Sequence, residues 1–348
     1  MPLPQVLTKR ALSMSTAILV AGVGGLFAVA WAFRPLTEAE AMARLRALGC
    51  SVQPSYVIVQ RVNQLKNDDL VLLRSMPSLR TLGLGQMRVS SDGLKYLEQI
   101  GSVERLYLRG ATIDDEDVAK LKNLSRLVEL DLSRTDITDS AAALIAEKQY
   151  LRLLYIDDTR IGENGLATLT RLSSLESLRL SMLSDSGSVQ VGRMRSLSSL
   201  HLLNSLITDV GLKHISQLEQ LRELNIVGDR FTDKGLCELA KLDSLEQLHV
   251  RGRGITGDGL ACFEAHAGLH DLQLSEFRLD ESTIRHIAHI HKLVRLRLCR
   301  CRVSSIESLS ELAQLEELEY VLLQDVQPAE VVAERLRELL PDVRIDSR

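Results

Sequence analysis

The stretch LRELNIVGDRFTDKGLCELAKLDS, residues 221–244, decides the fold. In its opening residues, LRELNI, Leu224 and Ile226 stand two positions apart with a polar residue between them. This alternation predicts a short strand with one buried face. In the second half, Leu236, Leu239 and Leu242 recur every three residues, as on one face of a short helix. Thr232 and Asp233 stand where the N-terminus of that helix needs a capping side chain. The unit is therefore expected to be a strand, a turn and a short helix.

The same unit recurs along most of the chain. The pattern L-x-x-L-x-L/I/V begins at Leu79, Val103, Leu127, Leu151, Leu175, Leu197, Leu221, Leu245, Leu269, Leu293 and Leu315. The starts are 24 residues apart, except that the units beginning at Leu175 and Leu293 are 22 residues long. Because one unit cannot bury its own apolar stripe, the units are expected to stack around a continuous core.

The expected fold class is α/β, in the form of a right-handed solenoid. A strand that reaches the next parallel strand through a helix takes a right-handed crossover. Parallel strands stand about 4.8 Å apart, whereas helices are wider. The strands should therefore form a curved parallel sheet on the inside of an arc, with the short helices outside.

This repeat resembles that of the leucine-rich-repeat superfamily, over about residues 55–345. The variant T-D-x-G-L, found at 208–212 and 232–236, is similar to the 24-residue repeats of bacterial, planctomycete-like proteins. The family often carries Asn eight residues after the first leucine, where its side chain links neighbouring loops. Here that position holds Ala111, Thr135, Thr159, Ser205, Asp229, Arg253, Phe277 and Cys301. The polar ladder is therefore expected to be weak or irregular.

The N-terminal region contains an uncharged run of 22 residues, 12–33. As a helix it would be about 33 Å long, against a hydrocarbon thickness of about 30 Å, which predicts one transmembrane anchor. Lys9 and Arg10 precede the run, and the positive-inside rule then places the N-terminus in the cytoplasm and the repeats outside it. The alternative is a signal peptide cleaved after Ala28-Val29-Ala30, which would leave a secreted protein.

The chain divides into six segments around the anchor. These are a tail at 1–11, the transmembrane anchor at 12–33, a capping helix and linker at 34–54, a degenerate first repeat at 55–78, leucine-rich repeats at 79–327 and a C-terminal cap at 328–348. Thr37 and Glu40 fit a capping box at the start of the first helix. Small residues spaced by four at Ala17, Ala21 and Gly25 are compatible with a weak homodimer through the anchor.

Neither a nucleic acid nor a catalytic reaction is indicated by the sequence. The net charge is -4, from 46 acidic and 42 basic residues, so no basic field attracts a polyanion. No Gly-rich phosphate loop, nucleophile elbow or H-E-x-x-H motif occurs. We therefore expect a protein that is not an enzyme and has no cofactor.

Histidines and cysteines provide two weaker signals. His266, His286 and His289 could form a surface zinc or nickel site, although solvated histidines on a helix face are the default interpretation. The five cysteines are scattered and odd in number, so no disulfide framework is predicted. Cys299 and Cys301 are interpreted as structural thiols.

The inner face of the sheet is the candidate binding surface. Side chains two, four and six residues past the first leucine of each unit should point away from the core. They carry blocks of alternating charge and few aromatic rings, which favours a polar protein partner. The residues proposed for it are Arg105, Tyr107, Arg109, Glu129, Asp131, Tyr155, Asp157, Arg179, His201, Asn225, His249, Arg251, Arg295 and Arg297.

Three functions remain open at this point. The first is a membrane-anchored scaffold that binds a protein through this face. The second is a secreted or envelope structural protein without a specific ligand. The third, with the least support, is a metal-binding enzyme.

Overall fold

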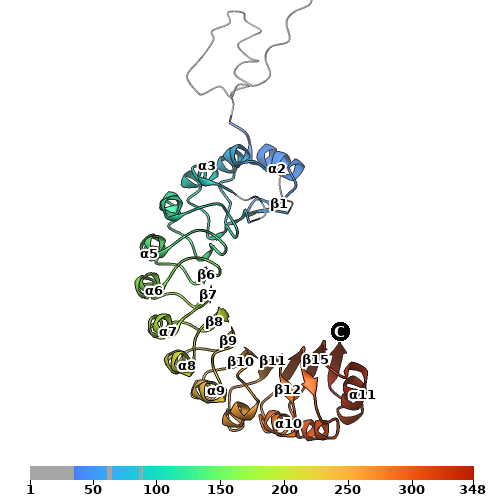
Figure 1. The fold of residues 1–348 in the computed structure, drawn as a ribbon. Helices are drawn as coiled ribbons and strands as arrows, with labels where there is room; N and C mark the ends of the chain where they lie inside the picture. The colour runs from blue at the N-terminus through green and yellow to red at the C-terminus, as the bar shows by residue number, and fades with distance from the viewer. Residues whose placement is uncertain (1–34, 61–64, 86, 88) are drawn as a thin grey trace, which may run out of the picture.

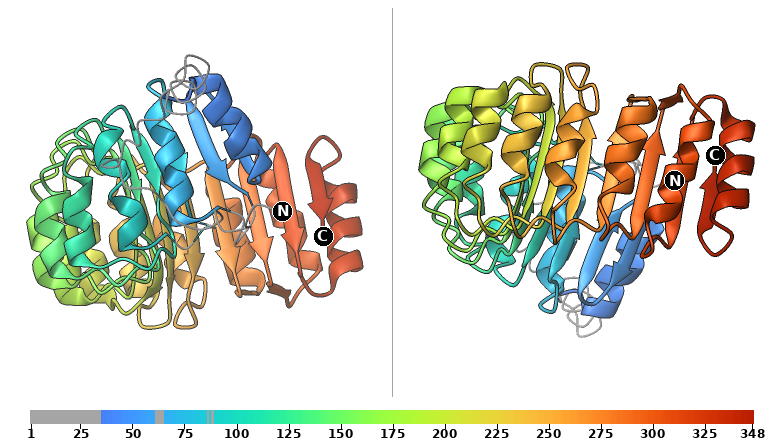
Figure 2. Two further views of the ribbon diagram at one scale, coloured as in Figure 1. Left: turned by 90° about the horizontal axis from the view of Figure 1, so that it is seen from above. Right: turned by 90° about the horizontal axis from the view of Figure 1, so that it is seen from below.

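The computed structural model describes residues 35–60, 65–85, 87 and 89–348. They form an arc with strands along its inner side and helices along its outer side (Figure 1). Figure 2 shows the helices stacked as one layer over the outer face of the sheet. The expected tail and anchor, residues 1–33, lie outside the described residues. None of the helices in the described ranges is both long and apolar enough to cross a bilayer.

One sheet of 14 strands runs through the described residues, and its strands follow one another in chain order. All neighbours in it are parallel except β1 (Cys50–Gln53) and β2 (Tyr56–Val59), which form an antiparallel pair at the N-terminal edge. The remaining strands are β3 (Thr81–Gly83), β4 (Arg105–Tyr107), β5 (Glu129–Asp131), β6 (Leu153–Tyr155), β7 (Ser177–Ser181), β8 (Ser199–Ser205), β9 (Glu223–Gly228), β10 (Gln247–Arg251), β11 (Asp271–Ser275), β13 (Arg295–Cys299), β15 (Tyr320–Gln324) and β16 (Arg344–Ser347). A second, two-stranded sheet pairs β12 (Arg278–Leu279) with β14 (Arg302–Val303).

The helical side of the units is less uniform than the sequence indicates. The α-helices are α2 (Glu38–Ala47), α3 (Ser91–Leu94), α4 (Asp115–Val118), α5 (Asp139–Ile145), α6 (Glu163–Leu169), α7 (Asp185–Val191), α8 (Asp209–Ile215), α9 (Asp233–Leu239), α10 (Glu281–Ala288) and α11 (Ala329–Leu339). Other stretches form 3-10 helices instead: η1 (Asn67–Ser75), η2 (Leu97–Gln99), η3 (Ala119–Leu121), η4 (Asp258–Phe263) and η5 (Glu307–Gln314).

The repeated leucines form one continuous core, as their spacing predicts. Leu221 and Leu224 at the strand, and Leu236 and Leu239 on the helix, are fully buried. Along β10 the burial alternates residue by residue, so that Leu248 and Val250 face the core. Burying a leucine side chain stabilises a fold by roughly 1.5–3 kcal/mol, and here each leucine is covered by the same positions of the adjacent units.

Only one of the two predicted short units is short. Leu178 pairs with Leu200, which confirms the 22-residue unit that begins at Leu175. The prediction for the last unit is wrong, because Leu296 pairs with Val321 and the unit is 25 residues long. Its strand begins after Leu318, whereas Leu315 ends the preceding 3-10 helix. Leu315 and Leu318 were both candidates for the first leucine of the last unit. The sequence pattern selected Leu315, which is wrong.

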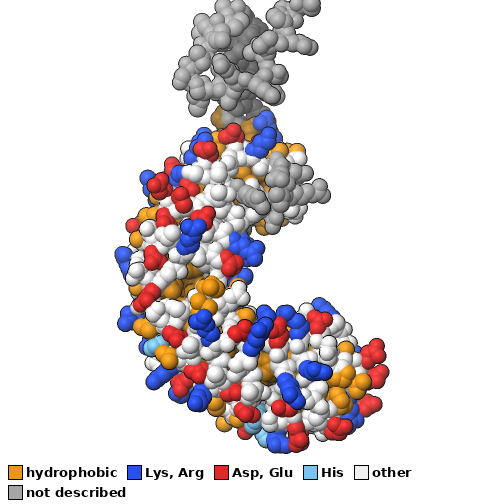
Figure 3. Space-filling view, in the orientation of Figure 1, with side chains coloured by type: hydrophobic (Ala, Val, Ile, Leu, Met, Phe, Trp, Pro, Cys, Tyr) orange, Lys and Arg blue, Asp and Glu red, His pale blue; other side chains and the backbone are white. Residues whose placement is uncertain are grey.

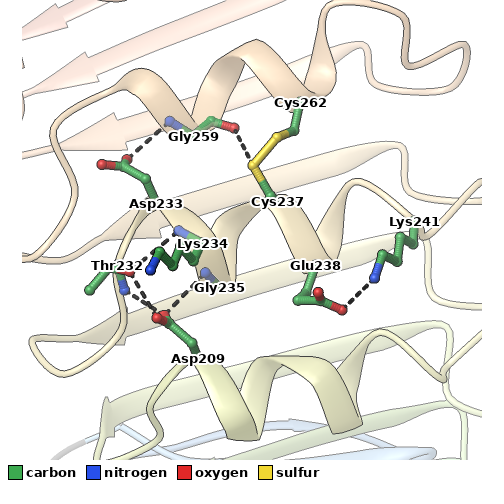
Figure 4. Close-up of a disulfide and its surroundings, with 10 residues drawn as sticks. All are labelled: Asp209, Thr232, Asp233, Lys234, Gly235, Cys237, Glu238, Lys241, Gly259 and Cys262. Atoms are coloured by element: carbon green, nitrogen blue, oxygen red, sulfur yellow. Dashed lines mark hydrogen bonds and ion pairs between the residues drawn. A yellow bond between two sulfur atoms is a disulfide. The ribbon is translucent and has the colours of Figure 1, made fainter.

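A ladder of aspartates links the helix starts of neighbouring units. The Oδ atoms of Asp209, the first residue of α8, accept hydrogen bonds from the backbone N–H and the hydroxyl of Thr232, the N-cap of α9, at 2.7 and 2.8 Å. Figure 4 shows this contact of Asp209 with Thr232. Asp185 binds Thr208 in the same way, and Asp233 binds Thr256. Thr138 likewise donates to Asp115. Each aspartate therefore satisfies a helix N-terminus of the next unit.

This ladder also explains the glycine of the T-D-x-G-L motif. The Gly235 N–H donates to Asp209 Oδ1 at 3.1 Å, and a Cβ atom at Gly235 would lie 2.4 Å from that oxygen. At Gly211 a Cβ atom would lie 2.5 Å from Asp185 Oδ1. The glycine is needed because the carboxylate of the previous unit occupies the space of a side chain.

At the position where the family often has Asn, the polar contacts are irregular, as expected. The hydroxyls of Thr135 and Thr159 bind carbonyls three residues earlier in their own units, at 2.6 and 2.8 Å. Ser205 instead reaches Leu183 O in the preceding unit, at 3.4 Å. The aspartates at the helix starts form a separate polar ladder, which was not predicted from the sequence.

Replacing Asp209 by alanine should lower the free energy of unfolding by about 2 kcal/mol, because three donors of the next unit lose a charged acceptor. Urea titration followed by circular dichroism measures this loss. Asp243→Ala is the matched control, since Asp243 is exposed and lies outside the ladder. Equal stability of the two variants would contradict a structural role for the ladder.

A disulfide joins Cys237 of α9 to Cys262 of η4, across adjacent units (Figure 4). The two residues are 25 positions apart in sequence, and their Cα atoms are 5.3 Å apart. No disulfide was predicted from the sequence, and this one forms because about one repeat length separates the two cysteines on neighbouring helices. Cys50, Cys299 and Cys301 are free and buried, and burial raises the pKa of Cys50 and Cys301 to about 11.

The Cys237→Ser, Cys262→Ser double variant should lose about 3 kcal/mol of stability, since a crosslink closing a loop of this length restricts the unfolded chain. Urea titrations of the oxidised wild type and of the variant provide the comparison. Reducing agent should weaken the wild type to the level of the variant and leave the variant unchanged. A wild type insensitive to reduction would show that the two thiols are not joined.

Both ends of the described solenoid are covered. At the N-terminal end, the expected capping box is present: Thr37 Oγ1 accepts from Glu40 N, and Thr37 N donates to Glu40 Oε2 at 2.9 Å. The edge strand at this end is β1, which pairs antiparallel with β2. At the other end, α11 packs next to β16, which extends the sheet beyond β15.

Candidate binding surface

The predicted surface residues lie together on one face of the sheet. Twelve of them belong to β4–β10 and β13, and Arg109 and Asp157 follow directly after β4 and β6. The strand register places Tyr107 beside Asp131, Asp131 beside Tyr155 and Tyr155 beside Arg179. Farther along, His201 lies beside Asn225, which lies beside His249. The spacing of the repeat thus becomes rows of side chains across the inner face.

Asp157 is the centre of a buried ion-pair cluster. Only 1% of its surface is exposed, and its carboxylate contacts Arg109 Nη1 and Arg179 Nε at 3.0 Å each. Ser133 Oγ donates to the same carboxylate at 2.8 Å. Removing either arginine would leave a buried charge poorly compensated, which destabilises a fold. Arg109 and Arg179 therefore hold the sheet together in addition to lining the surface.

A second cluster of the same kind surrounds Asp271 on β11. Arg295 Nε and Arg297 Nη2 both contact Asp271 Oδ2, at 2.8 and 3.0 Å. Asp271 is 1% exposed, and its Oδ1 accepts no hydrogen bond from the described part of the chain. Arg297 also reaches across β11 to His249 Nε2, at 3.1 Å. The position of Asp271, two residues after Leu269, places it on the predicted inner face beside Arg295, although it is not one of the residues proposed above for binding.

The two histidines of the surface are held in half-buried positions. His201 Nε2 lies 3.5 Å from Glu223 Oε1 and 3.1 Å from Ser199 Oγ. Burial lowers the pKa of His201 and of His249, and neighbouring arginines add to the effect. Glu223, and for His249 also Asp271, act in the opposite direction. Both imidazoles are therefore neutral at pH 7.

Two tyrosines stand on either side of the acidic residues of β5. Burial, together with Glu129, raises the pKa of Tyr155 to about 12 and that of Tyr107 still further. Their hydroxyls remain protonated at any physiological pH and can donate hydrogen bonds. Arg105, in the neighbouring row, donates from Nε to Thr81 Oγ1 at 3.0 Å. This end of the surface is therefore a hydrogen-bonding surface with fixed donors.

The three histidines considered for a metal site do not converge. His286 Nδ1 and His289 Nδ1 lie 2.6 and 3.4 Å from Glu264 Oε1, on the outer side of the arc. His266 is buried instead, with Nε2 2.9 Å from Leu242 O and Nδ1 accepting from Leu269 N. It occupies the position of a core leucine and binds carbonyl and amide groups. Among the described residues, no group of three or more His, Cys, Asp or Glu could hold a metal ion.

The rim where the strands end was not considered from sequence. Residues at or directly after the ends of the strands adopt a left-handed backbone although they are not glycine: Met182 (φ 58), Glu276 (φ 67) and Arg300 (φ 53) follow a strand, and Asn204 (φ 47) is the last but one residue of β8. This conformation costs about 1–2 kcal/mol for a side-chain-bearing residue. Glu276 Oε1 contacts both Arg251 Nη2 and Arg300 Nη1, at 2.9 and 3.1 Å. A left-handed turn leaves no reliable signal in sequence unless glycine or asparagine occupies it.

Comparison with known proteins supports the fold and goes no further. No family model matches the chain, and no curated protein matches its sequence. Among solved structures, it is similar to an internalin (inlF) from Listeria monocytogenes, with a TM-score of 0.52 and 19% identity over 93% of this chain and 89% of the other. A leucine-rich-repeat protein of Leptospira interrogans aligns with a TM-score of 0.44 and 17% identity over 82% and 81% of the two chains.

The repeat, the parallel sheet and this likeness define the class: the described part of the chain is a leucine-rich-repeat solenoid. Within that class, the likeness to the internalin is one of fold, since only 19% of the aligned residues are identical.

Stability should fall as the pH drops from 7 to 5, because both surface histidines have a lowered pKa in the folded state. Below the ordinary value of 6.5, the unfolded chain binds protons that the folded chain does not, so stability is fully present above pH 6.5 and is lost as the pH falls toward the folded pKa. Urea titrations at pH 7 and 5 on the wild type and on His201→Asn, His249→Asn measure the effect. A variant that loses as much stability as the wild type would contradict this cause.

Proposed function

We propose that this protein is a non-catalytic scaffold that binds a protein partner through the inner face of its sheet. The observation that carries the proposal is the largely polar surface across β4–β13, where ion pairs with Asp157 and Asp271 hold four arginine side chains in place. Side chains already fixed in one geometry lose little conformational entropy when a partner binds. A surface of charged, hydrogen-bonding groups suits a folded protein partner with complementary charges.

The state of the acidic residues supports a binding role over catalysis. Asp157 and Asp271 are almost completely buried, and two arginines cover each of them. A general base must come within hydrogen-bonding distance of a substrate proton, which these carboxylates cannot do without displacing an arginine. The alternative of a metal-dependent enzyme has no group of ligands to support it in the described residues.

We further propose that residues 12–33 anchor the chain in a membrane, with the N-terminus in the cytoplasm and the repeats outside it. The disulfide between Cys237 and Cys262 supports an oxidising compartment for the repeats. Secretion after cleavage near Ala30 is the alternative for the same compartment. The T-D-x-G-L motif supports a planctomycete-like repeat type.

Site-specific photo-crosslinking in native membranes tests the binding surface. Asn225 and Gln273 lie on the inner face and make no ion pair, so each can be replaced by a photoreactive phenylalanine derivative. One dominant protein adduct is expected from both positions. The matched control is Gln217, which is exposed at the end of α8 on the outer side.

The proposal fails if neither inner position yields an adduct, or if Gln217 yields the same adducts as the inner positions. The first result would favour an envelope component without a specific ligand. Charge reversal at Arg109 or Arg179 is a poorer test, because it exposes the buried charge of Asp157 and disturbs the fold.

A further inference from the structure

A pocket interrupts the rim of the sheet at the middle of the arc. Met182, Leu206 and Val227 form its apolar side, while Asp229, Arg230 and Arg251 line the remainder. Figure 3 shows hydrophobic side chains gathered at the middle of the arc, next to Lys and Arg side chains on the inner side of the C-terminal arm. The pocket therefore lies where an apolar patch meets a charged one.

The pocket results from two glycines in the row of rim residues. Asn204 and Glu276 place side chains on the rim, but the equivalent positions between them are Gly228 and Gly252. A Cβ atom would lie 2.7 Å from Ser205 O at Gly228 and 2.6 Å from Gly228 O at Gly252. The strand pairing of β8 with β9 is also irregular between Leu202 and Ser205. The gap in the row of rim side chains is thus set by the backbone, which leaves no room for a side chain at Gly228 or Gly252. It does not depend on a side-chain rotamer.

Met182 forms the apolar wall at a cost to the fold. Its side chain is 57% exposed, and its backbone is left-handed, with φ 58. Glycine would adopt this conformation without strain, and a polar residue would suit the exposure. A large apolar side chain held in solvent next to a pocket is available to cover a partner's apolar group.

The rim on the C-terminal side of the pocket is strongly basic. We define the basic rim as the arginines at the end of β10, in the turns after β9, β10 and β13, and at the start of β12 and β14: Arg230, Arg251, Arg253, Arg278, Arg300 and Arg302. Three acidic residues, Asp229, Glu276 and Asp280, lie in the same stretches between these strands and the helices that follow them, all of which the structure describes. Glu276 is shared between Arg251 and Arg300, and Asp229 contacts Arg253 at 3.8 Å. The basic rim therefore carries three positive charges in excess, six arginines against three carboxylates.

We propose that the pocket and the basic rim together bind an extended acidic segment of a protein partner, with one apolar side chain in the pocket. This inference rests on the proposed function and locates its contact on the rim. The excess positive charge selects carboxylates, and the wall of Met182, Leu206 and Val227 selects an aliphatic or thioether group. A nucleic acid or acidic polysaccharide offers no such group, and the rim presents no aromatic ring on which a base could stack.

The probe is a displayed library of random dodecapeptides, selected against the purified full-length chain. Enriched peptides should contain Leu, Met, Ile or Phe within three positions of two or more acidic residues. Synthetic copies labelled with fluorescein, measured by anisotropy, should bind roughly tenfold more weakly to Arg230→Glu, Arg251→Glu and to Met182→Glu. All three residues are exposed or half-exposed, so the fold tolerates these changes.

Arg171→Glu, Arg195→Glu is the matched control, because both arginines are exposed in the turns that precede β7 and β8, at the opposite edge of the sheet. Its affinity for the peptides should equal that of the wild type. The proposal is overturned if no peptide is enriched, if enriched peptides lack acidic residues, or if the rim variants bind them like the wild type. Tighter binding of a single-stranded DNA 20-mer than of the peptides would also overturn it.

Crosslinking at Asn225 and Gln273 separates this failure from that of the proposed function. If both positions give an adduct in the wild type while the peptide test fails, because no acidic peptide is enriched or because the rim variants bind the peptides like the wild type, the inner face binds a partner and the rim does not. If no adduct forms at either position, the proposed function fails independently of the peptide result.

Discussion

Each coil of this protein can bury its leucines only against the next coil, and this constraint governs the rest of the structure. Leu221, Leu224, Leu236 and Leu239 are fully buried, yet a single unit has no second layer to cover them. Equivalent residues of neighbouring units must therefore lie side by side, with the strands paired in one register. The aspartate ladder holds that register at the helix starts, since Asp209 lies against Gly235 of the following unit. Apolar burial and polar pairing thus require the same alignment.

The same alignment turns charges spaced by one repeat into clusters. Asp157 gathers Arg109 from two units before and Arg179 from the next, and Asp271 gathers Arg295 and Arg297 from the next unit. Each cluster contains two arginines and one buried carboxylate, so it retains a positive charge while fixing its guanidinium groups. The inner face is therefore both a structural element and a surface with pre-formed donors.

The C-terminal half of the arc differs from the N-terminal half in two ways. It contains the disulfide between neighbouring helices on the outside and the arginine-rich turns on the rim. The crosslink restrains two units whose strands, β9 and β10, end at the pocket. The disulfide on the outer side of the arc therefore joins the same two units that carry the pocket and the start of the basic rim on the inner side.

The sequence by itself determined the repeat, the alternation of strand and helix, the inner-face rows and the capping box at Thr37, because these depend on local periodicity and on spacing along the chain. The tertiary structure alone decided which leucine begins the last strand, which cysteines pair and which acids are buried. Those outcomes depend on which residues of adjacent coils come to lie side by side, as Cys237 and Cys262 do. They also depend on local backbone conformations that the spacing of residues in the sequence does not encode. His266 is an example of what the sequence leaves undecided. Its place in the leucine series was visible, but only its hydrogen bond with Leu242 O shows that it is a core residue and not a metal ligand.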